Sequence, residues 1–438
     1  MKTLAVIAVL AAACSSSSAP APVPTGSGSA TPTETPMTAW TDEWLLAQGA
    51  AFLHDTPARR AALEAALTNP ANMYSRIRLA AYGLGDRGWD LLPVWNPRSM
   101  PVDAALDAVL ARGEMPAIPD DRAPLWNGVT PTTMPAWIAL GRRVFFEYPM
   151  RAEVFMEYAL TEPALATDVG VQRTTSGDIP GLVVFANVDG QTRVGITCAI
   201  CHSNVKGGDV LAGQARRSFN YGKLRVTYDR LHGMLRSEEE ATRMLAWGPG
   251  RADVTEDDDE DPVAIPDLWG LRDQRWLTQA GTIKHDSPLA LAIRQETQLT
   301  DSNHALIRPP RELAWALAMY IYSLKPPVHA AAPQPNGKAL FDEHCARCHS
   351  NAAYGGNAIA VSTIGTDPAL ATGKGRGTGK YRVPALLDVR NGAPFLHHGA
   401  VASLDELLSP TRTEPGHTPG TKLSPGDRAA LIAFLETL

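Results

Sequence analysis

The chain has 438 residues, enough for two or three domains, and is 45% hydrophobic and 20% charged, as ordinary globular proteins are. Its formal net charge is -6 and it has no basic tract, which argues against nucleic acid as a partner. The one dense charge run, 256–261, is interpreted as a solvated loop. A calcium-binding loop is the alternative, but the run lacks the glycine-punctuated spacing of an EF-hand.

Residues 1–14 predict a secretory signal, because a lysine and a short apolar stretch are followed by three alanines and Cys14. Small residues that end on a cysteine resemble a bacterial lipoprotein box, although Leu10 stands four residues before the cysteine instead of three. A plain signal peptide cut near Ala13 is the alternative. Residues 15–39 are rich in Ser, Pro, Thr, Ala and Gly and predict a flexible tether. We therefore expect an exported, periplasmic protein whose only membrane contact is a lipid anchor.

The next elements are helical until a predicted β-hairpin. Residues 40–130 contain Trp- and Ala-rich stretches of helical pattern without a chemical motif, and are interpreted as an accessory region that packs on the following domain. A helix is predicted over 134–148. Within 181–198, two apolar stretches flank Asp189-Gly190, which is a hairpin turn signal.

The four cysteines beyond Cys14 form two copies of one pattern, at 198–202 (the first motif) and 345–349 (the second motif). C-x-x-C-H is the attachment signature of haem c, because residues three and four apart share a helix face, so two thiols can bind the haem while the histidine reaches the iron. A redox disulfide or a zinc site is the alternative, but each leaves the histidine that follows, twice, unexplained. We predict two covalently attached haem c groups. The residues expected to hold them are Cys198, Cys201 and His202, and Cys345, Cys348 and His349, with the two histidines as iron ligands.

The elements after the first motif suggest that one arrangement, a helix followed by the motif and then by a closing helix, occurs twice. A closing helix is predicted at 311–327, stopped by its final prolines. A short helix reaching Phe341 precedes the second motif, and the last helix begins at the N-cap Ser424 with Pro425 as its first residue. A helix before the motif and a closing helix across it resemble a class I cytochrome c domain, and the first motif repeats this arrangement at larger scale.

The predicted fold is therefore mainly α, with two cytochrome c-type haem domains. Its parts are the signal and lipoprotein box (1–14), the tether (15–39), the N-terminal helical accessory region (40–130), the first haem c domain with a small β-hairpin insertion (131–327), a linker (328–336) and the second haem c domain (337–438).

From about residue 130 onward the sequence resembles the dihaem cytochrome c peroxidase superfamily. The stretch GRRVFF (141–146) lies before the first motif, and 381–408 fits the pattern R-V-P-x-L…A-P-[YF]-x-H-x-G-x-x-x-[ST]-L. The residues that fit are Arg382, Val383, Pro384, Leu386, Ala393, Pro394, Phe395, His398, Gly399, Ser403 and Leu404. The resemblance is looser over 203–310. Related members include dihaem enzymes that modify protein tryptophans and dihaem rubber oxygenases.

The second haem departs from the peroxidase pattern. Peroxidases of the family place a methionine ligand shortly after the stretch that corresponds to 403–408, but this chain has no methionine after Met319. The Gly-His pair before the last helix resembles the bis-His arrangement of the rubber-oxygenase branch, so His417 is the expected second iron ligand. An imidazole in place of a thioether should lower the haem potential. The alternatives are His397, His398, Tyr381 and Tyr354.

The resemblance also bears on the region between the haems. Family peroxidases have a tryptophan there, and the matching position in this chain is Gln279, with Trp269 and Trp276 near in sequence as substitutes. Arg382 is expected to pair with a propionate of the second haem, because its rigid donor fork suits a carboxylate.

The sixth ligand of the first haem iron separates a catalyst from an electron carrier. The resemblance implies an open or displaceable position, and Glu296 is the candidate acid/base for peroxide cleavage because family members place a glutamate after the equivalent loop. A solvated helix carboxylate is the alternative interpretation of Glu296. Arg294 or Arg272 could stabilise developing negative charge. Candidate closing ligands are His232, Met234, Met244 and His285.

Three functions are compatible with these features. In the first, the second haem takes an electron from a small redox protein and the first haem reduces peroxide or activates oxygen. In the second, the chain is a non-catalytic periplasmic electron carrier with two six-coordinate haems. The third is a dihaem oxygenase that acts on an apolar substrate.

Overall fold

The computed structural model describes residues 40–253 and 261–438, so the predictions on residues 1–39 and on the acidic run up to Glu260 lie outside the described residues. Within those two ranges, no helix is long and apolar enough to cross a membrane. We call residues 131–327 the first lobe and 337–438 the second lobe.

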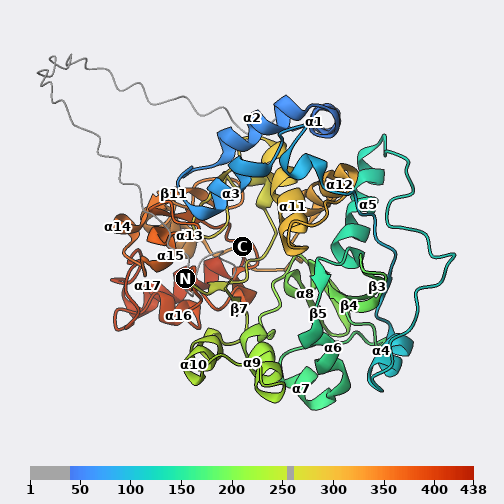
Figure 1. Ribbon diagram of the computed structural model, residues 1–438. Helices are drawn as coiled ribbons and strands as arrows, with labels where there is room; N and C mark the ends of the chain where they lie inside the picture. The colour runs from blue at the N-terminus through green and yellow to red at the C-terminus, as the bar shows by residue number, and fades with distance from the viewer. Residues whose placement is uncertain (1–39, 254–260) are drawn as a thin grey trace, which may run out of the picture. The chain divides into compact units, whose positions relative to one another are not determined.

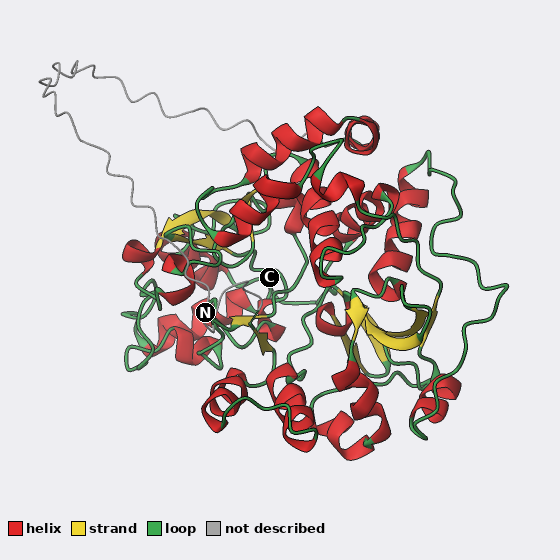
Figure 2. Ribbon diagram, in the orientation of Figure 1, coloured by secondary structure: helices red, strands yellow, loops and turns green. Residues whose placement is uncertain are grey.

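Most of the secondary structure is helical (Figures 1 and 2). The helices are α1 (Asp42–His54), α2 (Thr56–Ala66), α3 (Met73–Ala81), α4 (Ala104–Leu110), α5 (Met134–Glu147), α6 (Val154–Thr161), α7 (Pro163–Asp168), α8 (Ala199–His202), α9 (Tyr221–Leu231), α10 (Glu238–Trp247), α11 (Pro288–Ser302), α12 (Arg311–Ser323), α13 (Pro335–His344), α14 (Val361–Ile364), α15 (Ala369–Thr372), α16 (Leu404–Leu407) and α17 (Pro425–Leu435). The strands are β1 (Ser99–Pro101), β2 (Arg151–Ala152), β3 (Leu182–Ala186), β4 (Thr192–Ile196), β5 (Ser203–Lys206), β6 (Asp209–Ala212), β7 (Arg251–Ala252), β8 (Val263–Ala264), β9 (Trp276–Leu277), β10 (Ile283–Lys284), β11 (Gly356–Ala360) and β12 (Lys380–Val383).

The predicted hairpin is present as β3 and β4, which pair antiparallel from Leu182–Ile196 to Ala186–Thr192. It belongs to a wider sheet than the sequence predicted, with the order β1-β3-β4-β2. The hydrophobic core of the first lobe gathers on this sheet, where Val184 and Val194 are fully buried. The sheet leads directly into the first motif, because β4 ends two residues before Cys198.

The first lobe is closed by a very tight crossing of α5 and α12, which lie side by side in Figure 1. A Cβ atom on Gly141 would lie 1.9 Å from the carbonyl oxygen of Ala316, so only glycine allows the two backbones to approach this closely. One turn further, the rings of Phe145 and Tyr320 pack with centroids 5.3 Å apart and planes inclined by 59°.

The second lobe contains the same crossing, between α13 and α17. A Cβ atom on Gly337 would lie 2.1 Å from the carbonyl oxygen of Ala430. One turn further, Phe341 and Phe434 pack with centroids 5.4 Å apart and planes inclined by 55°. The sequences agree as well: each motif is preceded by a helix with Gly-x-x-x-Phe and followed by a closing helix with Ala-x-x-x-aromatic. The two lobes therefore share one structural plan around their motifs.

The N-terminal region packs on both lobes. Helices α1 and α2, blue in Figure 1, lie against α11 and α12 of the first lobe, as predicted for an accessory region. In addition, the backbone N–H groups of Met73 and Tyr74 donate to the carbonyl oxygens of Lys374 and Gly375 in the second lobe, at 2.9 and 3.0 Å.

Candidate functional site

The first motif forms the short helix α8 and presents two free thiols. Burial raises the pKa of Cys198 to about 12 and that of Cys201 to about 11. Both side chains are therefore neutral thiols at pH 7. Structural zinc sites use thiolates, and no cluster of three or more His, Cys, Asp or Glu side chains suited to a metal ion occurs within 40–253 and 261–438. A structural zinc site uses four donors, whereas two thiols with one adjacent histidine are the donor set of thioether attachment.

His202 is oriented as an axial haem ligand would be. Its Nδ1 lies 3.0 Å from the carbonyl oxygen of Pro266, which can only accept, so Nδ1 carries the proton and Nε2 keeps its lone pair. Burial lowers the pKa of His202 to about 4, which keeps the ring neutral. The backbone of the motif is fixed because Gly213 donates to the carbonyl of His202, at 2.8 Å.

The second motif repeats this arrangement. The Nδ1 atom of His349 lies 2.6 Å from the carbonyl oxygen of Tyr354, and burial lowers the pKa of His349. The motif continues directly from α13, because Cys345 donates to the carbonyl of Phe341 at 2.8 Å. In both motifs a carbonyl from outside the motif therefore fixes the histidine tautomer, an orienting device that iron-binding histidines commonly use.

His417 lies on a loop that holds it in an unusual backbone conformation, with φ of 44°. Gly416, at φ of 79°, packs so tightly that a Cβ atom would lie 2.3 Å from the Thr366 nitrogen. Arg412 fixes the loop by donating to the carbonyls of Leu407 at 2.7 Å, Glu414 at 2.9 Å and also Gly416.

The His417 side chain is half-buried, and its buried Nδ1 atom has no hydrogen-bond partner among the described residues. Burial, and next the charge of His349, lower the pKa of His417 to about 4, so the two imidazoles lie close enough to influence one another. A buried polar atom without a partner requires an explanation, and the predicted role of His417 as an iron ligand is compatible with a neutral imidazole at this place.

The competing candidates near the second motif have other partners. His397 stacks on Tyr381 and on His398, with centroids 3.9 and 4.3 Å apart. The Nε2 atom of His398 lies 2.9 Å from Glu414, and the Tyr381 hydroxyl donates to the carbonyl of Asp367 at 2.6 Å. Tyr354 packs its ring on Phe341 in the lobe core.

The four candidates for the sixth ligand of the first haem iron have other neighbours or are exposed. Both ring nitrogens of His285 are engaged, Nδ1 by the carbonyl of Gln274 at 2.7 Å and Nε2 by the Tyr322 hydroxyl. His232 is exposed and Met234 is 59% exposed. Met244 is buried in a small cluster with Trp247. None of the four therefore has a geometry that singles it out as an iron ligand.

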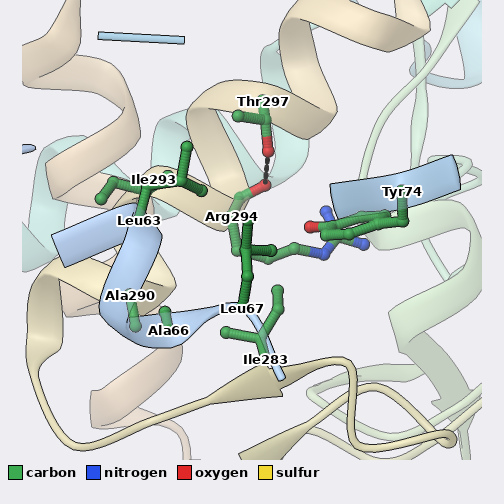
Figure 3. Close-up of a pocket in the computed structure, with 9 residues that line it drawn as sticks. All are labelled: Leu63, Ala66, Leu67, Tyr74, Ile283, Ala290, Ile293, Arg294 and Thr297. Atoms are coloured by element: carbon green, nitrogen blue, oxygen red, sulfur yellow. Dashed lines mark hydrogen bonds between the residues drawn. The ribbon is translucent and has the colours of Figure 1, made fainter. Parts of the chain in front are cut away.

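Arg294 and Glu296 lie on opposite faces of α11, because two residues correspond to a rotation of about 200°. The charge of Arg294 lowers the pKa of His202 and of Cys198, so Arg294 lies beside the first motif. It also lines, with Tyr74, a small pocket between α2 and α11 (Figure 3). The pocket has room for no more than about one water molecule.

Glu296 faces away from the motif and lies in a buried network. Its oxygens accept from the Tyr82 hydroxyl at 2.7 Å and pair with Arg311 at 3.1 Å, and Arg311 also pairs with Asp90 at 2.8 Å. This geometry gives no support to the predicted acid/base function of Glu296. The hydrogen-bond and ion-pair network of Glu296 links the N-terminal region to α11 and α12.

Arg382 extends from β12 of the second lobe toward the first motif. Its backbone N–H donates to the carbonyl of Gln279 at 3.0 Å, and its charge lowers the pKa of His202. Burial lowers the pKa of Arg382 to about 10, a value that leaves the side chain charged at pH 7. Arg382 thus contacts the first lobe through Gln279, and its predicted pairing with a propionate of the second haem stays a prediction. Arg272, in contrast, donates to the carbonyl of Trp40.

The residue predicted to replace the interhaem tryptophan also lies between the lobes. The side chain of Gln279 donates to the carbonyl of Ala264 at 3.0 Å and lies 3.4 Å from Arg382. Trp269 donates to the carbonyl of Ala212 at 3.1 Å, next to Gly213, which bonds His202. Arg412 and the carbonyl of Pro266 could not be identified as parts of the site from the sequence, because neither belongs to a repeated pattern.

Comparison with known proteins identifies the C-terminal part. Residues 335–438 match the cytochrome c family model. No curated protein sequence matches the chain.

Two solved structures are similar at low levels. One is a MauG-like protein associated with microbial copper homeostasis, with 18% identity, a TM-score of 0.32, and coverage of 44% of this chain and 78% of that one. The other is the hydrazine synthase of Kuenenia stuttgartiensis, with 14% identity, a TM-score of 0.34, and coverage of 74% and 98%. Both TM-scores are low, so neither similarity indicates a function for this chain.

Proposed function

We propose that the protein is a dihaem c-type cytochrome in which the second haem transfers electrons and the first haem reacts with peroxide. The observation that carries this proposal is the repetition of one plan in both lobes. Gly141 and Gly337 allow the same helix crossing, and each motif histidine has its Nδ1 fixed by a carbonyl. The second lobe is the cytochrome c domain, and the proposal extends its cofactor to the first lobe.

Each haem would supply an iron that changes oxidation state, and the protein would determine what reaches that iron. Cys198 and Cys201 would hold the first haem, with His202 below the iron, and Cys345, Cys348 and His349 would hold the second. His417 would occupy the sixth coordination position of the second haem iron. Ligation by two imidazoles would favour electron transfer and a low reduction potential. Arg382 would lie between the two groups and would suit a haem propionate of either lobe.

At the first haem, the proposal is an accessible sixth position. Its support is that His285, the buried histidine candidate, has both ring nitrogens engaged. Arg294 would hold a positive charge beside the first haem and would suit one of its propionates. Peroxide reduction would then draw one electron from each lobe.

The alternative is an electron carrier in which both irons are six-coordinate. It requires that one of the candidate ligands, such as Met244, leaves its present environment when haem binds. Export to the periplasm, a lipid anchor at Cys14 and a small redox protein as electron donor remain part of the proposal from the sequence.

The test begins with haem content. The pyridine haemochrome assay on the purified protein should give two haems per chain, and replacing Cys198 and Cys201 by Ala should give one. EPR should show one low-spin and one high-spin ferric signal, and cyanide should convert only the high-spin signal. A single haem in the wild-type protein would exclude the dihaem proposal. Two low-spin signals that do not respond to cyanide or peroxide would establish the electron carrier.

A further inference from the structure

A continuous set of aromatic rings runs through the first lobe along α6 and α9. The ring of Tyr221 lies 6.5 Å from that of Phe155, and Phe155 lies 5.1 Å from Tyr228, measured between centroids. Tyr228 stacks on His232 at 3.9 Å, and His232 is exposed. The set therefore connects the interior of the lobe to its surface.

The inner end of this set lies beside the first motif. Cys201 and Tyr221 pack against the same hydrophobic core. The carbonyl of Cys201 accepts from the backbone N–H of Arg216 at 2.8 Å, and the carbonyl of Arg216 accepts from Phe219 at 3.1 Å. The Phe219 ring packs on the Tyr221 ring, with centroids 6.0 Å apart. In the proposed haem protein the Cys201 sulphur is bonded to the haem, so the electron path would begin one covalent bond from the macrocycle.

Tyr221 also has a proton acceptor. Its hydroxyl donates to Oε2 of Glu153 at 3.1 Å, and Glu153 is 2% exposed. Arg151 pairs with the same carboxylate at 2.8 Å, which fixes the orientation of the carboxylate toward the phenol. A phenol that loses an electron becomes a strong acid, so a fixed carboxylate at hydrogen-bond distance makes the oxidation easier. Tyr148 is the contrasting case, because its buried hydroxyl has no partner.

We propose that Tyr221 is a redox-active tyrosine that passes electrons between the first haem and a one-electron donor at the exposed end of α9. The inference rests on the proposed function, since peroxide acting through the haem at Cys201 is the oxidant. Tyr221 gives one electron to the haem and its phenolic proton to Glu153, which leaves a neutral tyrosyl radical and a protonated carboxyl. The donor returns one electron through Tyr228 and Phe155, and Glu153 returns the proton.

The same rings could be close only because two helices pack together, so the test must separate packing from redox chemistry. The dihaem protein is mixed with hydrogen peroxide and frozen for EPR, with ring-deuterated tyrosine in a parallel sample. We expect a radical signal that narrows on deuteration and is lost in Tyr221→Phe. It should persist in Tyr148→Phe, which removes a buried hydroxyl that has no proton acceptor.

A second measurement tests the path to the surface. Ferrocyanide is added as the one-electron donor, and Tyr228→Leu should form the radical but reduce it several-fold more slowly than the wild type. An unchanged signal in Tyr221→Phe overturns the inference, as does the absence of a tyrosyl signal when the optical spectrum shows that the first haem has reacted. If peroxide leaves that spectrum unchanged, the proposed function fails and this inference fails with it.

Discussion

Glu296 has structural partners that make a prediction for stability as well as for chemistry. Its carboxylate is buried between Tyr82 and Arg311, so Glu296→Gln removes a charge that Arg311 faces but keeps an acceptor for the tyrosine. We expect the free energy of unfolding to fall by about 1–3 kcal/mol, with peroxide turnover per haem unchanged. Denaturant titration and steady-state turnover measure the two effects. A loss of about a hundredfold or more in turnover at unchanged stability would restore the acid/base assignment.

The matched control for this change is a glutamate whose ion pair is exposed. Glu239 pairs with Arg243 on the surface of α10 at 3.4 Å, with 85% of its side chain exposed. Because exposed pairs contribute little, Glu239→Gln should change the free energy of unfolding by less than about 0.5 kcal/mol.

His285 predicts a pH dependence of stability. Burial lowers its pKa from 6.5 to about 4, so below pH 6.5 the unfolded chain binds a proton that the folded chain does not. Its contribution is therefore fully present above pH 6.5 and is lost as the pH falls toward 4, by about 3 kcal/mol in total. Urea unfolding at pH 7 and pH 4.5 should show a smaller difference for His285→Gln than for the wild type. Equal differences in the two proteins would contradict the assignment.

The two tight helix crossings make a prediction at the scale of elements. A methyl group on Gly337 would lie 2.1 Å from the Ala430 carbonyl, and one on Gly141 would lie 1.9 Å from the Ala316 carbonyl. Each glycine-to-alanine change should lower the free energy of unfolding of its lobe by at least about 2 kcal/mol, because backbone would have to move. Thermal unfolding followed by circular dichroism measures this.

The control for the crossings is Gly426, which lies in the first turn of α17. A Cβ atom there would meet nothing closer than 3.9 Å, so Gly426→Ala should leave stability unchanged or raise it slightly. Destabilisation of equal size at Gly426 and Gly337 would mean that the close approach is not the cause.

Elements that are marked by local capping or turn residues could be predicted from the sequence. The last helix begins at Pro425 with Ser424 as its cap, and β3 and β4 flank Asp189-Gly190, as the local signals indicated. The strands β1 and β2 have two or three residues each, too few for a periodic pattern, and their pairing depends on distant parts of the chain. The wider sheet could therefore not be predicted.

The candidate site also combines residues that local signals identify with contacts between distant parts of the chain. The cysteines and histidines of both motifs are contiguous in sequence and could be identified there. The carbonyl that orients His202 belongs to Pro266, 64 residues further along the chain, and no local signal connects the two. The packing of the N-terminal region on the second lobe was missed for the same reason, because the contacts of Met73 and Tyr74 with that lobe span about three hundred residues.

At the scale of the whole described chain, Arg217 joins the two lobes. Its guanidinium pairs with both oxygens of Asp267 at 3.0 and 2.9 Å and donates to the carbonyl of Gly392 in the second lobe at 2.9 Å. A lysine has one compact charge and cannot make this planar, forked set of bonds. We therefore expect Arg217→Lys to weaken the coupling between the lobes by about 1–3 kcal/mol, so that the second lobe unfolds at a lower urea concentration than the first.

Tryptophan fluorescence reports on the N-terminal region and the first lobe, because Trp315 is the last tryptophan of the chain, whereas haem absorption reports on both lobes. Followed in one titration, the two probes should separate in Arg217→Lys and coincide in the wild type. The control is Arg112→Lys, because Arg112 makes the same forked pair with Glu114, at 2.8 and 3.1 Å, but at an exposed position within one part of the chain. Since solvent screens an exposed ion pair, its loss should leave the two probes coincident. If both variants behave alike, the fork at Arg217 contributes nothing specific to the coupling, and the lobes are held together by apolar packing.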